Sequence, residues 1–279
     1  MSPVSVVVLT FNSEATIGAT LDSVAGLSDD VHVVDSGSTD GTLAIIAAKG
    51  AKLASHPFEN YGAQRNWAID NLPLQHPWQL HLDADERVTP ELKAEIEKLL
   101  VGDVAADIGG FYIPRLVHFH GQALRHGGMY PIYHMRLFRK GRGRCEARKY
   151  DQHFHAQGRS EKLQHPMIDD IRLSFGEWTT RHNRWADAEV DEILNPGLDG
   201  VIQAGTGDPV AEKRRARGWY YRAPLFWRAF MLFFYRYVVK LGFLDGKEGL
   251  IFYVLQTLWF RFLVDAKLYE RRKQIEARK

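Results

Sequence analysis

Two aspartates separated by one residue are the clearest candidates for chemistry in this sequence of 279 residues. Asp83 and Asp85 follow the apolar run Trp78 to Leu82, so a strand would hold both carboxylates at its exit, with their spacing set by the pleat. Hard cations such as Mg²⁺ or Mn²⁺ are commonly held by one or two carboxylates together with substrate phosphates. Such a cation stabilises the charge that develops on a departing diphosphate. Asp-x-Asp also arises by chance, so the prediction of a cation site depends on the position of the pair directly after a strand.

Polar residues also close two earlier apolar runs. Val4 to Thr10 ends in Thr10, and Val31 to Val34 is followed by Asp35. Strand and helix signals alternate through the first hundred residues, which is typical of a parallel sheet with helices on both faces. Ligands bind at the carboxyl ends of strands in such sheets, so we expect Thr10, Asp35 and Asp83 to line one site. A helix cap is the alternative role of a single aspartate at a strand end.

The other elements of this half follow from caps and periodicity. Asn12 or Ser13 is expected to cap the first helix, Lys52 to Ser55 reads as a short strand, and Thr89 and Pro90 read as the cap and first residue of a later helix. The expected apolar positions are Ile17, Leu21 and Val24 on one face of the first helix, Leu43 and Ile46 in the second, and Leu92, Ile96 and Leu99 on the buried face of the later helix.

The alternation weakens after residue 108. Phe111 to Phe138 reads as irregular strands rich in His, Tyr and Gly, and a helix is expected up to Leu194, before Asn195-Pro196-Gly197. We therefore expect a domain over 1–210 that is divided into two halves, 1–108 and 109–210. A basic, aromatic region follows over 211–279.

Charge is distributed unevenly along the chain. Residues 211–279 hold 16 Lys and Arg against 6 Asp and Glu, a surplus of about +10, whereas residues 1–210 hold 20 against 28, about −8. Aromatic residues accompany the basic surplus and no nucleic-acid motif does, so an anionic phospholipid surface is favoured as the partner over nucleic acid.

Two apolar stretches in this tail, Ala223 to Leu241 and Gly249 to Val264, are interrupted by charged or polar residues, so neither reads as a clean membrane span. We expect an amphipathic helical hairpin in the membrane interface, with Arg228, Arg236 and Lys240 at the headgroups. The alternative is a hairpin packed on the catalytic domain.

Several classes are disfavoured. The single cysteine, Cys145, excludes an internal disulfide framework, and no signal-peptide pattern opens the sequence, so a cytoplasmic protein is expected. The histidines between His118 and His155 match no zinc spacing and have no thiolate among them. A dinucleotide oxidoreductase is disfavoured because the first strand lacks a Gly-x-Gly-x-x-Gly turn.

The motifs together resemble those of family 2 inverting glycosyltransferases with the GT-A fold. The resemblance rests on Val6 to Asn12, Val33 to Thr42, Gln64-Arg65-Asn66 and Asp83-Ala84-Asp85. Within that family the chain is most similar to lipopolysaccharide core glycosyltransferases, through three later segments: Gly127-Gly128-Met129-Tyr130-Pro131, Arg136-Leu137-Phe138 and Leu241-Gly242-Phe243-Leu244-Asp245-Gly246. The implied fold is a Rossmann-like, mostly parallel α/β sheet, with the helical hairpin added at the carboxyl end. In that fold residues 1–108 would be the nucleotide-sugar-binding half and residues 109–210 the acceptor-side half.

The resemblance implies roles for individual residues. Thr10, Asn12 and Glu14 would line the base pocket, and Asp35 would hydrogen-bond the base. Gln64, Arg65 and Asn66 would reach the base or the diphosphate, for which a solvated helix start is the alternative. Asp83 would contact the ribose or a metal-bound water, and Asp85 the metal. Arg136 or Arg139 would meet the diphosphate or an acidic acceptor, or else form a surface pair.

Inversion requires a base on the acceptor hydroxyl. The family's acidic residue falls at Tyr150 to Phe154, which makes Asp151 the candidate and His153 the next, although relatives carry a His-Glu pair there. The expected activity is transfer from a nucleotide-sugar to a lipid-linked saccharide at the inner face of the cell membrane. The resemblance favours UDP-hexose as the donor, and ADP-linked heptose is the alternative. A polyprenyl-phosphate acceptor, which needs no base, is one alternative. A non-catalytic nucleotide-sugar-binding protein at the membrane is the other.

Overall fold

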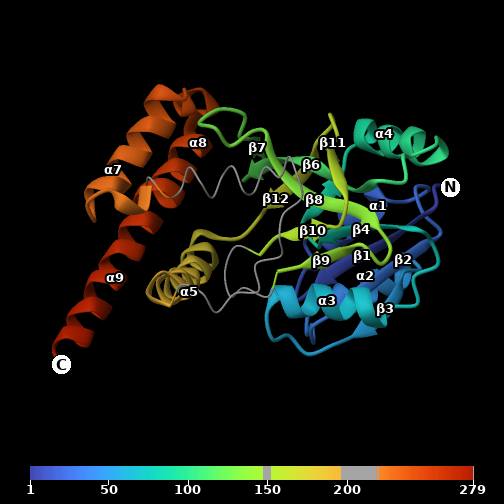
Figure 1. Ribbon diagram of the computed structural model, residues 1–279, viewed down its shortest axis with the longest axis horizontal. Coiled ribbons are helices and arrows are strands. Elements are labelled where there is room, and N and C mark those ends of the chain that lie inside the picture. Colours follow the sequence, from blue (N-terminus) through green and yellow to red (C-terminus); the bar gives the residue numbers. More distant parts are fainter. Residues whose placement is uncertain (147–151, 196–217, 219, 279) are drawn as a thin grey trace.

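The computed structural model describes residues 1–146, 152–195, 218 and 220–278. Its centre is a sheet with the strand order β3-β2-β1-β4-β8-β6-β12-β5, to which β7 and β11 add by pairing with β6 (Figure 1). The sheet strands are β1 (Val4–Thr10), β2 (Asp30–Asp35), β3 (Lys52–Ser55), β4 (Trp78–Asp83), β5 (Glu86–Val88), β6 (Ile108–Phe119), β7 (Gln122–Ala123), β8 (Ile132–Arg139), β11 (Arg159–Lys162) and β12 (Met167–Ile171).

The first four strands of that order are parallel, and helices cover both of their faces. In β1, Val6 and Val8 face a core shared with helices α1, α2 and α4, whereas Val7 packs on the other face with Ala68 of α3. The alternation of side chains along a strand explains this division. The helices are α1 (Ile17–Ser23), α2 (Thr42–Ala48), α3 (Tyr61–Asn71) and α4 (Pro90–Val101). The predicted α/β class is confirmed.

The second half of the sheet is mixed. β8 lies antiparallel between β4 and β6, with Gln79 opposite Phe138 and Leu80 opposite Leu137. β12 runs parallel to β6, and β5 pairs antiparallel with β12. A separate two-stranded ribbon, β9 (Gly143–Cys145) with β10 (Phe154–Ala156), packs beside β8. This arrangement brings strands from distant parts of the sequence to the end of β4.

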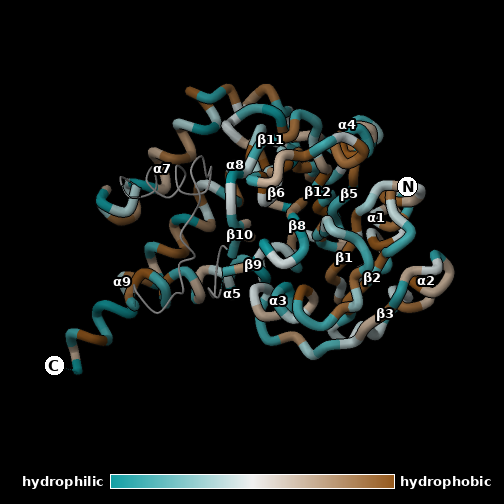
Figure 2. The backbone as a smooth tube through the Cα atoms, turned by 45° about the vertical axis from the view of Figure 1, so that its right-hand side comes forward, coloured by the Kyte–Doolittle hydropathy of each residue, from teal (hydrophilic) through white to brown (hydrophobic). Residues whose placement is uncertain are grey.

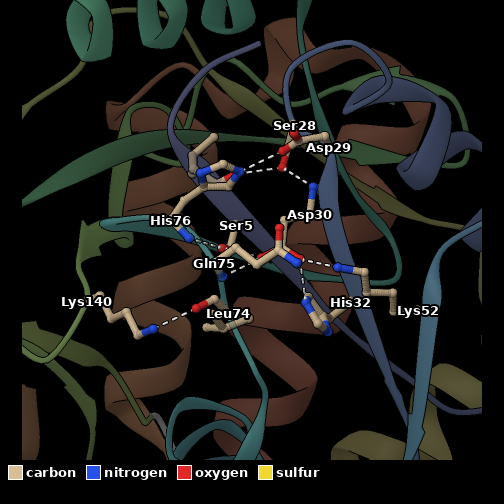
Figure 3. A network of polar contacts seen from close by, with 11 residues as sticks. Ser5, Ser28, Asp29, Asp30, His32, Lys52, Leu74, Gln75, His76 and Lys140 are labelled. Atoms are coloured by element: carbon tan, nitrogen blue, oxygen red, sulfur yellow. Dashed lines mark hydrogen bonds and ion pairs between the residues drawn. The ribbon is translucent and has the colours of Figure 1, made fainter.

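A buried carboxylate links the parallel strands at the end of the sheet opposite to the carboxyl end of β4 (Figure 3). Asp30 begins β2 and is fully buried. It accepts hydrogen bonds from Ser5 Oγ of β1 at 2.6 Å, from Lys52 Nζ of β3 at 2.6 Å and from the Gln75 N–H before β4 at 2.8 Å, and it contacts His32 Nε2 at 2.8 Å. Burial alone would raise the pKa of Asp30, but these donors hold the pKa well below its ordinary value.

The carboxyl-terminal helices form a layer beside the sheet domain, together with α5 (Phe175–Leu194) (Figure 1). Ala186 and Val190 of α5 pack against Phe260, Val264 and Leu268. The elements of this layer are α7 (Trp227–Phe234), η1 (Tyr235–Val239), η2 (Gly242–Asp245), α8 (Gly246–Tyr253), η3 (Val254–Trp259) and α9 (Phe260–Glu276). Figure 2 shows hydrophobic segments along these helices as well as in the sheet.

A buried aspartate fastens this layer to the sheet domain. Asp245 accepts hydrogen bonds from the backbone N–H of Arg125 at 3.0 Å, from that of His126 at 3.1 Å and from the Tyr253 hydroxyl at 2.9 Å. The oxygen of the same Tyr253 hydroxyl lies 2.8 Å from the His126 carbonyl oxygen. Two of the three later segments that the sequence singled out, around Gly127 and around Asp245, are thus in direct contact.

Three expectations are corrected or limited by the structure. Asn12 does not cap a helix: its φ is +46°, its side chain accepts from Thr39 N–H, and α1 begins at Ile17 after Thr16. Arg228 does not reach headgroups, because it is 2% exposed and paired with Asp265. The expected boundary at 210 falls outside the described residues.

One continuous helical run meets the length and composition expected of a membrane span. It extends over Gly242–Glu276, and 39% of its most apolar window is buried inside the protein.

Candidate active site

Four charged side chains form a network at the carboxyl end of β4. Arg65 of α3 donates from Nη2 to both oxygens of Asp83 at 3.0 Å. Arg136 of β8 donates to Asp83 Oδ2 at 2.8 Å and to Glu86 Oε1 at 2.6 Å. Burial tends to raise the pKa of Asp83, but Arg136 and Arg65 outweigh it and lower the pKa. Asp83 is therefore ionised, and both guanidiniums are held at the strand end.

Asp85 has a different environment from Asp83. No described residue hydrogen-bonds its carboxyl group, which faces a cleft. Burial, followed by the charges of Asp169 and Asp83, raises the pKa of Asp85 well above its ordinary value. Asp169 comes from β12, and burial raises its pKa too, although Arg115 pairs with it at 3.1 Å. The site thus gathers carboxylates whose mutual repulsion a cation would relieve.

The cleft has a volume of about 810 Å³ and joins the strand ends to the carboxyl-terminal helices. On the sheet side it is lined by Arg65, Asp83, Asp85, Arg136 and Asp169. On the helical side it is lined by residues of α5 and of the carboxyl-terminal layer, among them Trp178, Arg181, Trp185, Tyr220, Tyr235, Gln256 and Arg261.

The predicted base-pocket residues lie at the ends of β1 and β2. Thr10 is 5% exposed, and its hydroxyl has no hydrogen-bond partner among the described residues. Asp35 accepts from Gly37 N–H at 2.8 Å and Ser38 N–H at 2.9 Å. Asn12 Oδ1 accepts from Thr39 N–H at 2.8 Å, and Glu14 Oε2 accepts from Gly41 N–H at 2.8 Å. These bonds order the 36–41 loop, and the base-binding role of the four residues stays a prediction.

Gln64 and Asn66 of α3 make structural contacts. Gln64 Nε2 donates to Ser36 Oγ at 3.0 Å, and its Oε1 meets His56 Nδ1 at 2.7 Å. The Asn66 amide bonds both backbone groups of Cys145 at 2.9 Å, which ties α3 to β9. Gln64 is 1% exposed and Asn66 is half-buried, so neither side chain is fully solvated. Their contact with a donor stays a prediction.

Arg136 and Arg139 have different surroundings, and only one of them belongs to the site. Arg136 is 4% exposed and belongs to the aspartate network. Arg139 donates to the backbone carbonyls of Val104 and Ile108 and stacks on Trp78, with 4.5 Å from its guanidinium carbon to the ring centre. Only Arg136 lines the cleft.

The candidate base Asp151 lies outside the described residues. His153, the second candidate, is 6% exposed and lines the cleft. His81 lies beneath the site, where burial and then Arg65 and Arg136 lower its pKa to about 3, so its ring is neutral.

Sequence reasoning missed Glu86 and Asp169 as members of the site. Glu86 follows Asp85 directly, so the acidic run was visible in the sequence. Asp169 is 84 positions away from Asp85, and no local pattern marks their proximity.

The donor set fits a hard divalent cation. Asp85 presents unpaired carboxylate oxygens to the cleft, and Asp83 and Asp169 add negative charge beside it. Within the described residues no group of three or more His, Cys, Asp or Glu side chains is placed to hold a metal. A cation at Asp85 would therefore complete its coordination with diphosphate oxygens and water, as Mg²⁺ commonly does.

Comparisons with known proteins agree on a class. The family model described as "Glycosyl transferase family 2" matches residues 5–163. The lipopolysaccharide core biosynthesis glycosyltransferase LpsC of Rhizobium meliloti is 24% identical over 276 residues, which cover 96% of this chain and 93% of that protein. An uncharacterized glycosyltransferase of Rickettsia felis is 40% identical over 97 residues, which are 35% of this chain and 34% of that one.

Among solved structures, glucosyl-3-phosphoglycerate synthase from Mycobacterium tuberculosis, in complex with Mn²⁺, uridine diphosphate and phosphoglyceric acid, aligns with a TM-score of 0.45. That alignment has 15% identity and covers 71% of this chain and 80% of that one.

Proposed function

The chain belongs to glycosyltransferase family 2, with its GT-A α/β fold, and from that premise we propose that it transfers a sugar, with inversion, from a nucleotide-sugar to a hydroxyl of a lipid-linked saccharide. One observation carries the proposal: Asp83 and Asp85 end β4 in a cleft where Arg65 and Arg136 are already fixed. The similarity to a lipopolysaccharide core enzyme over 96% of the chain supports the acceptor class.

The donor is proposed to be a UDP-hexose, with its diphosphate at the end of β4. Arg65 and Arg136 would donate to diphosphate oxygens, because a guanidinium matches two oxygens in a fork. Mg²⁺ or Mn²⁺, held by Asp85 with Asp83 beside it, would supply neutralising charge to the leaving diphosphate. Thr10 and Asp35, at the neighbouring strand ends, would receive the base and ribose, where the buried Thr10 hydroxyl has a hydrogen bond still to make.

The test is turnover of a panel of UDP-, ADP- and GDP-sugars with deacylated lipopolysaccharide core oligosaccharide as the acceptor. Release of one nucleoside diphosphate, dependent on the acceptor and abolished by chelation, is expected. Release that is unaffected by chelation would contradict the metal assignment, and no release from any donor would contradict the transferase.

The general base is proposed to be Asp151, with His153 as its alternative. Asp151→Asn should lower kcat by about 10²–10⁴-fold if the carboxylate removes the acceptor proton. His153→Gln is the matched comparison on the same segment, and a larger loss from that variant would move the assignment to His153. Full activity of Asp151→Asn would favour an acceptor that is already anionic, such as a polyprenyl phosphate.

A membrane surface is the proposed partner of the carboxyl-terminal layer. Trp227, Phe230, Met231, Phe234 and Val238 recur at helical spacing along α7 and η1, and each is 42% exposed or more. We call these five residues the apolar face. The basic surplus of residues 211–279 suits an anionic phospholipid surface, which also would carry the lipid-linked acceptor. The proposed location is therefore the cytoplasmic face of the cell membrane.

Vesicle flotation tests this surface. The wild type should float with vesicles that contain phosphatidylglycerol, and a Trp227→Ser, Phe234→Ser double variant should remain in solution. Val101→Ser is a suitable control, because Val101 is an exposed apolar residue on α4, away from the apolar face. Equal flotation of the double variant would contradict the proposal.

A further inference from the structure

One wall of the cleft is formed by residues that the proposed donor site does not use. Trp178, Arg181, His182 and Trp185 of α5 all line the cleft, and their spacing places them on one side of the helix. Opposite them, the carboxyl-terminal layer contributes Tyr220, Tyr221, Tyr235, Gln256 and Arg261. The groove between these two sets is part of the cleft that also contains Asp83 and Asp85, and Met231 of the apolar face lines it too.

Arg181 is the unusual cation of this groove. Four other arginines that line the cleft are paired with carboxylates: Arg65 and Arg136 with Asp83, Arg115 with Asp169, and Arg261 with Glu189 at 2.6 Å. A fifth, Arg236, donates to the Gly127 carbonyl at 3.4 Å. Arg181 has no such partner in the described parts of the chain. Its one ring contact is with Trp185, at 5.9 Å from the guanidinium carbon to the ring centre.

Arg181 lines the same cleft as the proposed reaction centre. Asp83, Asp85 and Asp169 line that cleft from the sheet side, and Arg181 lines it from α5. An anion bound by Arg181 would therefore lie in the cleft that contains the Asp83-Asp85 end of β4.

The groove also has surfaces suited to a saccharide. Trp185 and Tyr220 are half-buried and line the groove, and aromatic rings of this kind can pack against the C–H face of a pyranose. The Tyr220 hydroxyl is buried and has no hydrogen-bond partner among the described residues, although such hydroxyls normally find one. Gln256 adds an amide whose oxygen meets His182 at 2.9 Å.

We propose that the groove between α5 and the carboxyl-terminal layer is the acceptor subsite, and that Arg181 binds a phosphate or carboxylate group carried by the acceptor saccharide. The inference rests on the proposed glycosyl transfer and deepens it, because it assigns the acceptor a negative charge near the hydroxyl that is extended. Tyr220 would hydrogen-bond the same saccharide, and Trp185 would pack against it.

The test compares Arg181→Gln with wild type on deacylated core oligosaccharide in three forms: untreated, dephosphorylated with hydrofluoric acid, and carboxyl-reduced. Wild type should bind and extend the untreated form about 10- to 100-fold better than the form that lacks the recognised anion, as expected for a charge-assisted hydrogen bond. The treated form that loses activity identifies phosphate or carboxylate as the group.

Arg181→Gln should lower kcat/KM for the untreated form by a similar factor, mainly through KM, and should no longer distinguish it from the treated form. Arg181→Lys should recover part of the loss. Arg184→Gln is the control, because Arg184 lies on the same helix but is exposed and outside the cleft.

Three results would overturn the inference: equal use of all three oligosaccharides by wild type, an equal loss on charged and uncharged forms in Arg181→Gln, or weakened binding of nucleoside diphosphate in that variant. The last would place Arg181 on the donor. Nucleoside diphosphate binding by the same preparations separates these failures from failure of the transferase, since a protein that binds none lacks the donor site altogether.

Discussion

Replacing Arg136 by methionine should destabilise the protein strongly, because the change leaves a buried carboxylate without its cation. Arg136 is 4% exposed and Glu86 2% exposed, and their charged atoms are 2.6 Å apart. Asp83 is less affected, since it keeps both contacts with Arg65 at 3.0 Å. Breaking a buried ion pair by removing one partner costs about 3–5 kcal/mol of stability. Because Glu86 still accepts a hydrogen bond from the Asp83 N–H at 3.0 Å, we expect a loss at the lower end, about 3 kcal/mol.

Urea unfolding, followed by tryptophan fluorescence, measures this loss. The double variant Arg136→Met, Glu86→Gln removes the stranded charge and should recover most of the stability, which gives a coupling energy of about 2 kcal/mol. If Arg136 also contacts the donor, both variants should bind nucleoside diphosphate weakly, although the double variant recovers its stability. A loss below about 1 kcal/mol in Arg136→Met, or no recovery in the double variant, would refute the reasoning.

Three further predictions concern the frame around the site. Asp245→Ala leaves the backbone N–H groups of residues 125 and 126 without their acceptor and should lower the free energy of unfolding by about 3 kcal/mol. The variant should also make the carboxyl-terminal layer susceptible to limited proteolysis and raise the acceptor KM more than the donor KM. Gly127→Ala should destabilise by about 1–3 kcal/mol in urea unfolding, because its φ is +60° and a Cβ would lie 2.3 Å from the Tyr253 hydroxyl oxygen. Asp30 has a lowered pKa, so its stabilisation is present above the ordinary aspartate pKa of about 3.9 and is lost as the pH falls below it. The stability of Asp30→Asn, followed by thermal melting, should accordingly be lower at neutral pH and depend less on pH below 4.

The parallel half of the fold was predictable because its signals are local. β1 and β3 have the expected bounds, and Thr89 and Pro90 begin α4 as cap and first residue. Strands buried on both faces read as continuous apolar runs, and the polar residues at their ends mark the ligand edge. The alternation therefore identified the class without tertiary information.

The site itself depends on contacts that no local pattern encodes. Arg136 reaches Asp83 across 53 positions because β8 inserts antiparallel beside β4, and Asp169 comes near Asp85 because β12 joins the sheet beyond β6. The position of Arg228 was predicted wrongly for a similar reason. Arg228 looked like a surface cation by spacing, but its partner Asp265 is 37 positions away on α9.

Calorimetric titration of UDP, ADP and GDP, with and without Mn²⁺, tests the central claim most directly. Wild type and Asp103→Asn, which changes an exposed carboxylate on the α4–β6 connection, should bind one diphosphate tightly only with the metal, and Asp85→Asn should lose that metal-dependent binding. Metal-dependent binding that survives in Asp85→Asn would contradict the metal site, and the absence of binding by wild type to every diphosphate would contradict the glycosyltransferase account.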